Sequence, residues 1–290
     1  MSSFMVIPRL VARHINLIQG NAVVSPHSMT AISLFLHAMG RKTGAFPEAF
    51  AVVQHDAWLD ADVMDGYGNY HAWQRRGAML VDKKDFIGSS NTLSLQPVIT
   101  GNVEFSLVVR YQGTAPAKQD VVRFLNSARF QGGEIPRVGS PSFFETESLA
   151  KRSLRTGKWI VDRRDRLENQ SDPIEEMMRI CLMRDPEESL ESEEAKDANG
   201  EENEEVRYSV KWSAATVGYA LLTEPSVFPN TRNAESGRVP AAYAEAMTGL
   251  VGMYSVHDPR ITAIPFWESG FVQDDVFLVR GFSPIMEKEG

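Results

Sequence analysis

The order in which apolar patterns follow one another restricts the fold of this chain more than any other feature. Branched apolar residues predict a strand over residues 5–13, where Pro8 would lie at a sheet edge or a bulge. Apolar residues at helical spacing then predict a helix that Ser28 or Thr30 caps and that Gly40 ends. Further along, the patterns predict strands over 50–59, 77–86 and 102–111, an amphipathic helix over 119–129 and a strand over 134–138.

This order of strand, helix, three strands, helix and strand is that of the split βαβ, or ferredoxin-like (RRM-like), pattern. The sequence therefore predicts an α+β core over residues 1–167, with a loop-rich, thumb-like insertion near residues 43–100. A short helix over 148–154 and a strand over Lys158–Asp162 would complete this core.

After the predicted core, the composition of the chain changes at residue 168 and again at residue 206. For residues 168–205, the composition predicts an acidic helix over 174–183 and, after it, a flexible linker rich in glutamate. Residues 206–290 predict a C-terminal α+β segment that packs on the core. Its patterns predict a strand over 206–222, a helix over 241–254 and a strand near the end of the chain.

The charge of the chain is divided unevenly. The formal net charge is −8, which by itself argues against a nucleic-acid partner. Residues 168–205, however, hold 15 acidic and three basic residues, so this segment carries −12 and the rest of the chain +4. Residues 123–166 hold ten basic and five acidic residues. We therefore expect a mildly basic body with an acidic insert that lies away from any RNA.

Several classes of protein do not fit the composition. No apolar run approaches the roughly 20 residues of a membrane span, and residues 1–10 lack the features of a signal peptide. One cysteine, Cys181, excludes an internal disulfide and a cysteine-based zinc site, and it fits a reducing cytoplasm. The six histidines show no metal-ligand spacing, and phosphate-loop and nucleophile-elbow motifs are lacking. We expect no metal, no cofactor and no membrane.

A metal-free ribonuclease is harder to dismiss on sequence. Such an enzyme can use one histidine as general base or acid, with a lysine, tyrosine or second histidine as partner. His14, His27 and His37 lie close to the first predicted strand and helix, although their spacing is not diagnostic. Lone histidines are more often structural than catalytic.

Nucleic-acid binding has the strongest support from residue types. Cations of residues 123–166 could neutralise phosphates, and Phe130, Phe143, Phe144 and Trp159 between them could stack on unpaired bases. The alternative is a basic, solvated face above core aromatic residues. Composition alone does not separate these two interpretations.

Blocks along the chain resemble a known family. The text PRL, then GNAVVSP, then a helix ending LFLHAMGRK resembles the opening of the Cas-five-type (second Csy-complex) subunit of the type I-F CRISPR Cascade, of the RAMP superfamily. Four further blocks follow in family order: VVQHDAWL, RFQGGEI, SLAKRSLRTGKWIVDRRDRL, and VGYALL with the run from residue 230 to residue 260. The family's Gly-Phe-Pro after Ser-Pro is replaced by SMTAIS, and its final Ser-Pro-His-Arg by VHDPR, which indicates a divergent branch.

The resemblance implies a non-catalytic, cytoplasmic, RNA-binding subunit of a crRNA-guided surveillance complex in antiviral defence. Such a subunit holds the 5′ handle of the crRNA and contacts the first backbone subunit and, where present, the large subunit. Target DNA is bound through the complex by guide pairing. Two alternatives stay open: a metal-free endoribonuclease of the same superfamily that processes the guide precursor, and a subunit that itself reads the DNA motif beside the target.

Motif matches nominate RNA-contacting residues in five blocks. A bare glycine backbone can approach phosphates closely, which is why the Gly-Gly block is included. The nominated residues are Asn21, Ser25 and His27 in the first loop; Arg41 and Lys42 after the first helix; Arg129, Gly132 and Gly133; Lys151, Arg152 and Arg155 in the basic helix; and Arg232 and Asn233 in the C-terminal loop.

Overall fold

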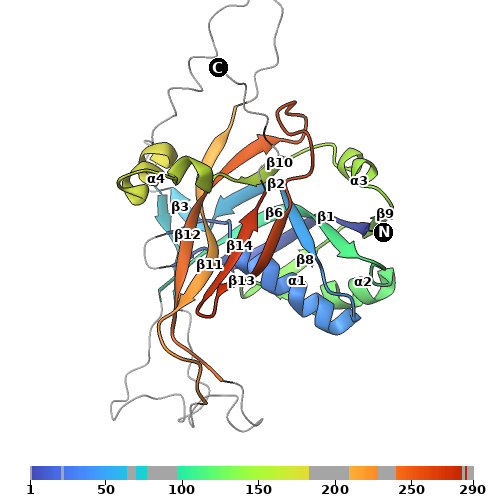
Figure 1. Cartoon of the computed structure of the whole chain (residues 1–290), viewed down its shortest axis with the longest axis horizontal. Helices are drawn as coiled ribbons and strands as arrows, with labels where there is room; N and C mark the ends of the chain where they lie inside the picture. The colour runs from blue at the N-terminus through green and yellow to red at the C-terminus, as the bar shows by residue number, and fades with distance from the viewer. Residues whose placement is uncertain are drawn as a thin grey trace, which may run out of the picture.

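A computed structural model gives the fold, and it describes residues 2–20, 23–63, 70–76, 97–182, 209–227, 240–282 and 285. The fold is α+β, and nearly all its strands belong to one antiparallel sheet (Figure 1). The strands of the first half are β1 (Ser2–Asn16), β2 (Ala49–Leu59), β3 (Ala61–Val63), β4 (Tyr70–Ala72), β5 (Gln74–Arg76), β6 (Pro97–Gln112), β7 (Arg129–Phe130), β8 (Gly133–Arg137), β9 (Ser142–Phe144) and β10 (Lys158–Asp162). The later strands are β11 (Lys211–Leu221), β12 (Ala244–Ser255), β13 (Trp267–Gln273) and β14 (Val276–Gly281). The helices are α1 (Met29–Thr43), α2 (Lys118–Ser127), α3 (Glu147–Ser153), the 3-10 turn η2 (Arg164–Leu167) and α4 (Pro173–Leu182).

The first half of the sheet has the strand order β2-β6-β1-β8, and each neighbouring pair is antiparallel. The helices α1 and α2 lie beside each other in Figure 1 and pack against the same face of these strands. Leu36 of α1 and Leu125 of α2 meet Leu10 and Leu107 of the two central strands in this core. All four side chains are almost completely buried, so burial of this face holds both helices in place.

The opposite face of the same strands is divided. Near the start of β1, Phe4 and Val6 pack against Ala150 of α3 and against Phe266 from the loop before β13. This second core includes the fully buried Trp159 of β10. Near the end of β1 the same face carries polar and charged residues instead, which forms the basis of the candidate site.

The later strands join the sheet through β2. They follow the order β10-β12-β11-β14-β13, and both ends of this row return to β2. Trp159 of β10 pairs with Val53, and Trp267 of β13 pairs with Phe50. The indole Nε1 of Trp267 also donates to the carbonyl oxygen of Ile160, at 3.0 Å. One edge of β2 therefore supports both ends of the C-terminal strands.

The helices predicted over 119–129 and 174–183 are confirmed as α2 and α4, apart from their last residues. The helix predicted over 241–254 is wrong, because this segment forms β12 between β10 and β11. Residues 249–254 of β12 are buried on both faces, so apolar residues do not alternate with polar ones in this segment. The prediction also missed β13, whose residues after Trp267 are mostly exposed or half-buried.

The first helix is confirmed, but it runs past Gly40. Ser28 caps its start by accepting a hydrogen bond from the backbone N–H of Ala31, at 3.1 Å. Its end is at Gly44, whose φ of 79° and N–H bond to the Gly40 carbonyl form the cap. Gly40 lies inside the helix, and the close approach of Phe46 accounts for the glycine, because a Cβ there would meet the Phe46 ring at 2.8 Å.

Other predictions cannot be compared with the fold. The strand predicted over 77–86 and nearly all of the acidic linker lie outside the described residues. Within the described part of the chain, no helix is both long enough and apolar enough to cross a membrane.

Replacing Gly44 by alanine is expected to lower the free energy of unfolding by about 1 kcal/mol, because φ is positive there and L-residues disfavour that conformation. No atom lies within 4 Å of a Cβ at this position, so backbone strain is isolated from steric overlap. Urea denaturation measures the effect. Gly270→Ala is the matched control, since its Cβ also meets open space but its φ is not in the left-handed range. Equal stability of the two variants would contradict the expectation.

Candidate nucleic-acid interface

Four exposed arginines share the polar half of the sheet face opposite α1 and α2. They are Arg9 and Arg13 of β1, Arg129 of β7 and Arg137 of β8, and we call this surface the arginine face. Strand register brings them together, because residues directly opposite in a ladder project to the same side. Arg13 and Arg129 both pair with Glu134, and Val11 pairs with Arg137 on one side and Glu104 on the other.

Glu104 of β6 is the centre of this surface. Its Oε1 accepts from Arg9 at 2.7 Å, and its Oε2 accepts from Arg137 at 3.4 Å. The hydrogen bond from Arg9 is the main reason that the pKa of this carboxyl lies below its ordinary value, so Glu104 is ionised and holds both guanidinium groups. Arg9 also donates to Thr156 Oγ1, at 3.0 Å, which ties the loop after α3 to the sheet.

Arg13 and Arg129 differ from the two clamped arginines. Both are exposed, and neither forms an ion pair or hydrogen bond with a side chain in the part of the chain that the structure describes. Glu134 lies between them in register. Exposed guanidinium groups that remain hydrated and unpaired are suited to bind phosphate oxygens, which they can contact through two N–H groups at once.

His55 of β2 lies on the same face beside Arg9. Its Nε2 is 2.7 Å from Ser106 Oγ, and that hydroxyl accepts a hydrogen bond from the backbone N–H of Arg9. Burial, and secondarily the nearby Arg9 guanidinium, lower the pKa of His55. His55 is therefore neutral at physiological pH and fixes the position of β1 relative to β6 and β2.

Of the residues nominated from sequence, the Gly-Gly block lies closest to this surface. Arg129 is part of the arginine face, and Gly132, with φ of 80°, forms the β7–β8 turn beside it. A Cβ at Gly133 would overlap the carbonyl oxygen of Arg13 and approach the side chain of Ile15 to 2.8 Å. The close approach of β8 to β1 therefore explains why residue 133 is a glycine.

The basic helix α3 and the residues after it are partly engaged in packing. Lys151 donates to the carbonyl oxygen of Ile261, at 2.6 Å, and burial lowers its pKa. Arg152 and Arg155 are exposed. Arg155 directly precedes Thr156, the residue that Arg9 contacts, so it lies at the margin of the arginine face.

Two nominated residues of the first loop, Ser25 and His27, are buried. Ser25 Oγ donates to the carbonyl oxygen of Ala214, at 2.6 Å, and His27 Nε2 is hydrogen-bonded to Gln54 Oε1. Burial lowers the pKa of His27 to about 4, so the imidazole is neutral. The two side chains connect the loop before α1 to β11 and β2, and both are buried.

The remaining nominated residues do not join this surface. Arg41 and Lys42 are exposed in the last turn of α1, the helix that covers the opposite face of the sheet. Asn21, Arg232 and Asn233 lie outside the described residues. Sequence reasoning did not nominate Arg9 or Arg13, and it counted Arg137 only among the cations of residues 123–166. The available signal was Arg9 and Arg13 in an otherwise apolar strand.

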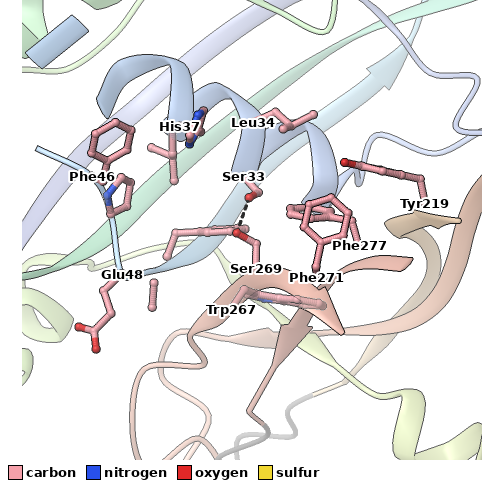
Figure 2. A pocket seen from close by; sticks show the side chains of 14 residues that line it. Ser33, Leu34, His37, Phe46, Glu48, Tyr219, Trp267, Ser269, Phe271 and Phe277 are labelled. Carbon is pink, nitrogen blue, oxygen red and sulfur yellow. Dashed lines mark hydrogen bonds between the residues drawn. The ribbon is translucent and has the colours of Figure 1, made fainter. Parts of the chain in front are cut away.

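A cavity of about 410 Å³ with a mostly apolar lining lies elsewhere in the fold and is shown in Figure 2. It lies between α1, the loop after α1, and strands β11, β13 and β14, and its wall includes Phe46, Phe271 and Phe277. The hydroxyl groups of Ser33 and Ser269 bond to each other across it, at 2.8 Å. Its lining holds no arginine or lysine, so its chemistry does not suit a phosphate backbone.

Comparison of the chain with family models and with curated proteins finds no match. Among the described residues, no group of three or more histidine, cysteine, aspartate or glutamate side chains could hold a metal ion.

The buried His27 predicts a pH dependence of stability. Its folded-state pKa of about 4 is below the ordinary 6.5, so the unfolded chain takes up a proton first as the pH falls. The stabilisation that neutral His27 provides is complete at pH values above its ordinary pKa of 6.5. It is lost as the pH falls from 6.5 toward the folded-state pKa of about 4. Between about pH 7.5 and about pH 5, the wild type should lose roughly 2 kcal/mol more unfolding free energy than His27→Gln.

Urea titrations at the two pH values measure this difference. His37→Gln is the control, because His37 is exposed and should leave the pH dependence of the wild type unchanged. A wild type and a His27→Gln variant with parallel pH profiles would show that His27 is already accessible to protons in the folded state.

Proposed function

We propose that this chain is a non-catalytic RNA-binding subunit of a type I-F-like CRISPR surveillance complex, similar to the Cas-five-type subunit. It would hold the 5′ handle of the crRNA, contact the backbone subunits and a large subunit where one exists, and support guide-directed binding of target DNA in the cytoplasm. The observation that carries the proposal is the arginine face, a surface of exposed guanidinium groups on a chain whose net charge is −8.

The strand order supports a ferredoxin-like (RRM-like) core for this subunit. The sequence β1, α1, β2, β6, α2, β8, with sheet order β2-β6-β1-β8 and both helices on one face, has the connectivity of that pattern. On this proposal, β3 to β5 between β2 and β6 belong to a thumb-like insertion. Strands β11 to β14 form the C-terminal extension.

The distribution of charge supports RNA as the ligand. Phosphate contacts supply most of the affinity of sequence-independent nucleic-acid binding, and arginine is well suited to make them. Arg13 and Arg129 are available for such contacts, while Arg9 and Arg137 are held in place by Glu104. The surface lies on a rigid sheet, which can hold a guide strand in one conformation.

The burial of His27 disfavours a metal-free nuclease in which His27 acts as the general base or acid. A general base must come within hydrogen-bond distance of the proton that it removes, and His27 is enclosed in the core between α1 and β2. His37 is exposed, but it belongs to α1, behind the sheet from the arginine face. His14, the third histidine of that alternative, is exposed on the arginine face, so cleavage that depends on it is a separate test. RNA binding without cleavage stays the proposed activity.

Co-expression with a CRISPR-array transcript and the neighbouring genes, followed by pull-down on this chain and sequencing of the bound RNA, tests the proposal. A uniform guide with a fixed 5′ handle and co-purifying backbone subunits is the expected result. A chain that elutes alone and free of RNA would refute it. Guide-dependent, sequence-dependent binding of duplex DNA by the chain would instead identify a reader of the target-flanking motif.

Reversing two charges on the arginine face should weaken guide binding. Arg13→Glu combined with Arg137→Glu is expected to reduce RNA affinity by about tenfold or more and to flatten its salt dependence, because phosphate contacts are lost. Filter binding at several salt concentrations measures both effects. Arg123→Glu on α2 is the matched control, since Arg123 is exposed on the helical side of the sheet. Equal affinities of the two variants would place the RNA elsewhere.

A further inference from the structure

We propose that His14 binds a ribose 2′-hydroxyl of the RNA on the arginine face, and so makes that surface selective for RNA over DNA. The inference rests on the proposed function, since it names the sugar contact of the same surface. It is carried by the contact of His14 with Asp60, which the sequence does not indicate.

Asp60 is a buried carboxylate with a complete set of donors. Its side chain is 7% exposed. Oδ2 accepts from Thr100 Oγ1 at 2.7 Å and lies 2.9 Å from His14 Nδ1, and Oδ1 accepts from Asn102 Nδ2 at 2.7 Å. Burial acts to raise the pKa of Asp60, but the hydrogen bonds from His14, Thr100 and Asn102 outweigh it and lower that pKa. Asp60 is thus ionised and can only accept hydrogen bonds.

An acceptor at Asp60 fixes the tautomer of His14. Because the carboxylate has no proton to give, Nδ1 of the imidazole must carry the hydrogen of this contact. In the neutral ring Nε2 is then a lone-pair acceptor. Nε2 has no hydrogen-bond partner among the residues that the structure describes, and the side chain is 43% exposed. The result is an oriented acceptor on the surface.

The backbone turns His14 toward this face. Its φ is 53°, a conformation that residues other than glycine disfavour, and the β1–β6 register shifts between Ala12 and Ile15. The backbone N–H of His14 donates to Asn102 Oδ1 at 3.2 Å, which stabilises the bulge. Strained backbone conformations cluster at active sites and ligand-binding sites.

The neighbours of His14 match the other parts of a nucleotide. Arg13, the preceding residue, is an exposed cation that suits a phosphate. Trp58 of β2 lies opposite Asn102 in the register, so it projects to the same face, and it is 43% exposed. An exposed indole can stack on an unpaired base. Phosphate, sugar and base therefore each have a complementary group.

The 2′-hydroxyl is the group that Nε2 can select. Phosphate oxygens only accept hydrogen bonds, and the deoxyribose of DNA carries no hydroxyl at this position. A 2′-hydroxyl can donate to the imidazole, and this hydroxyl is what allows a protein to distinguish RNA from DNA.

Fluorescence anisotropy with the purified full chain tests the inference. The probes are one single-stranded RNA, the DNA of the same sequence, and the same RNA with 2′-O-methyl groups, which cannot donate. We expect the wild type to bind the RNA about fivefold to tenfold more tightly than the other two, the effect of one hydrogen bond. His14→Ala and His14→Phe should remove this preference while leaving the affinity for DNA unchanged. His37→Ala on α1 should behave as the wild type.

Each other outcome would count against the inference. If His14→Ala weakens binding of RNA and DNA equally, His14 acts through charge or folding and the sugar contact is wrong. If the wild type does not discriminate, or the variants keep the preference, the hydroxyl is read elsewhere. RNA cleavage that depends on His14 would make it a general base instead. A wild type that binds neither RNA nor DNA would overturn the proposed function itself.

Discussion

The pairing of β2 with β6 on one edge, and with both β10 and β13 on the other, is the constraint on which the rest of the structure depends. One edge of β2 pairs with β6 along most of its length. The other edge pairs with Trp159 of β10 and with Trp267 of β13, whose side chains are both fully buried. A strand shared in this way cannot slide, because a one-residue shift would turn the buried side chains of β2 away from the cores that they fill. The fixed register of β2 then fixes β6, and β6 fixes β1.

The elements that pack on the two faces of the sheet determine where charged side chains can lie. One face is filled by α1 and α2, and half of the other face by α3 and the loop before β13. In the part of the chain that the structure describes, the end of the second face toward residues 13 and 102 is left for polar side chains. Arginines placed there remain hydrated, and Glu104 orders two of them without burying them. Among the described residues, the arginine face is thus confined to one end of one face.

The sequence predicts the parts of the fold that have a local signal. Helix α1 was predicted from apolar spacing, and α2 from its amphipathic face, because each has one buried side and one exposed side. Strand β12 was misassigned because burial on both faces removes the alternation that marks a strand. The end of α1 was placed at Gly40 because a glycine can serve packing as well as capping, and only the structure shows Phe46 against it.

The candidate site was much less predictable than the fold. Arg129 was nominated and lies on the arginine face, but Ser25 and His27, nominated from the same motif resemblance, are buried. The surface is made by register: Arg13, Glu134 and Arg129 are adjacent only after β1, β7 and β8 have paired. The contact between His14 and Asp60 joins residues 46 positions apart, and it depends on a bulge that no pattern in the sequence marks.

The shared edge of β2 also has a consequence for synthesis of the chain. Residues 50–54 leave the ribosome early, but their partners at Trp159 and Trp267 follow more than a hundred residues later. Until then β2 presents an unpaired edge, and its first half is almost wholly apolar. Such an edge invites pairing with other nascent chains. Slow or interrupted translation before residue 267 therefore exposes this protein to aggregation, and a chaperone that covers apolar strands would act in that interval.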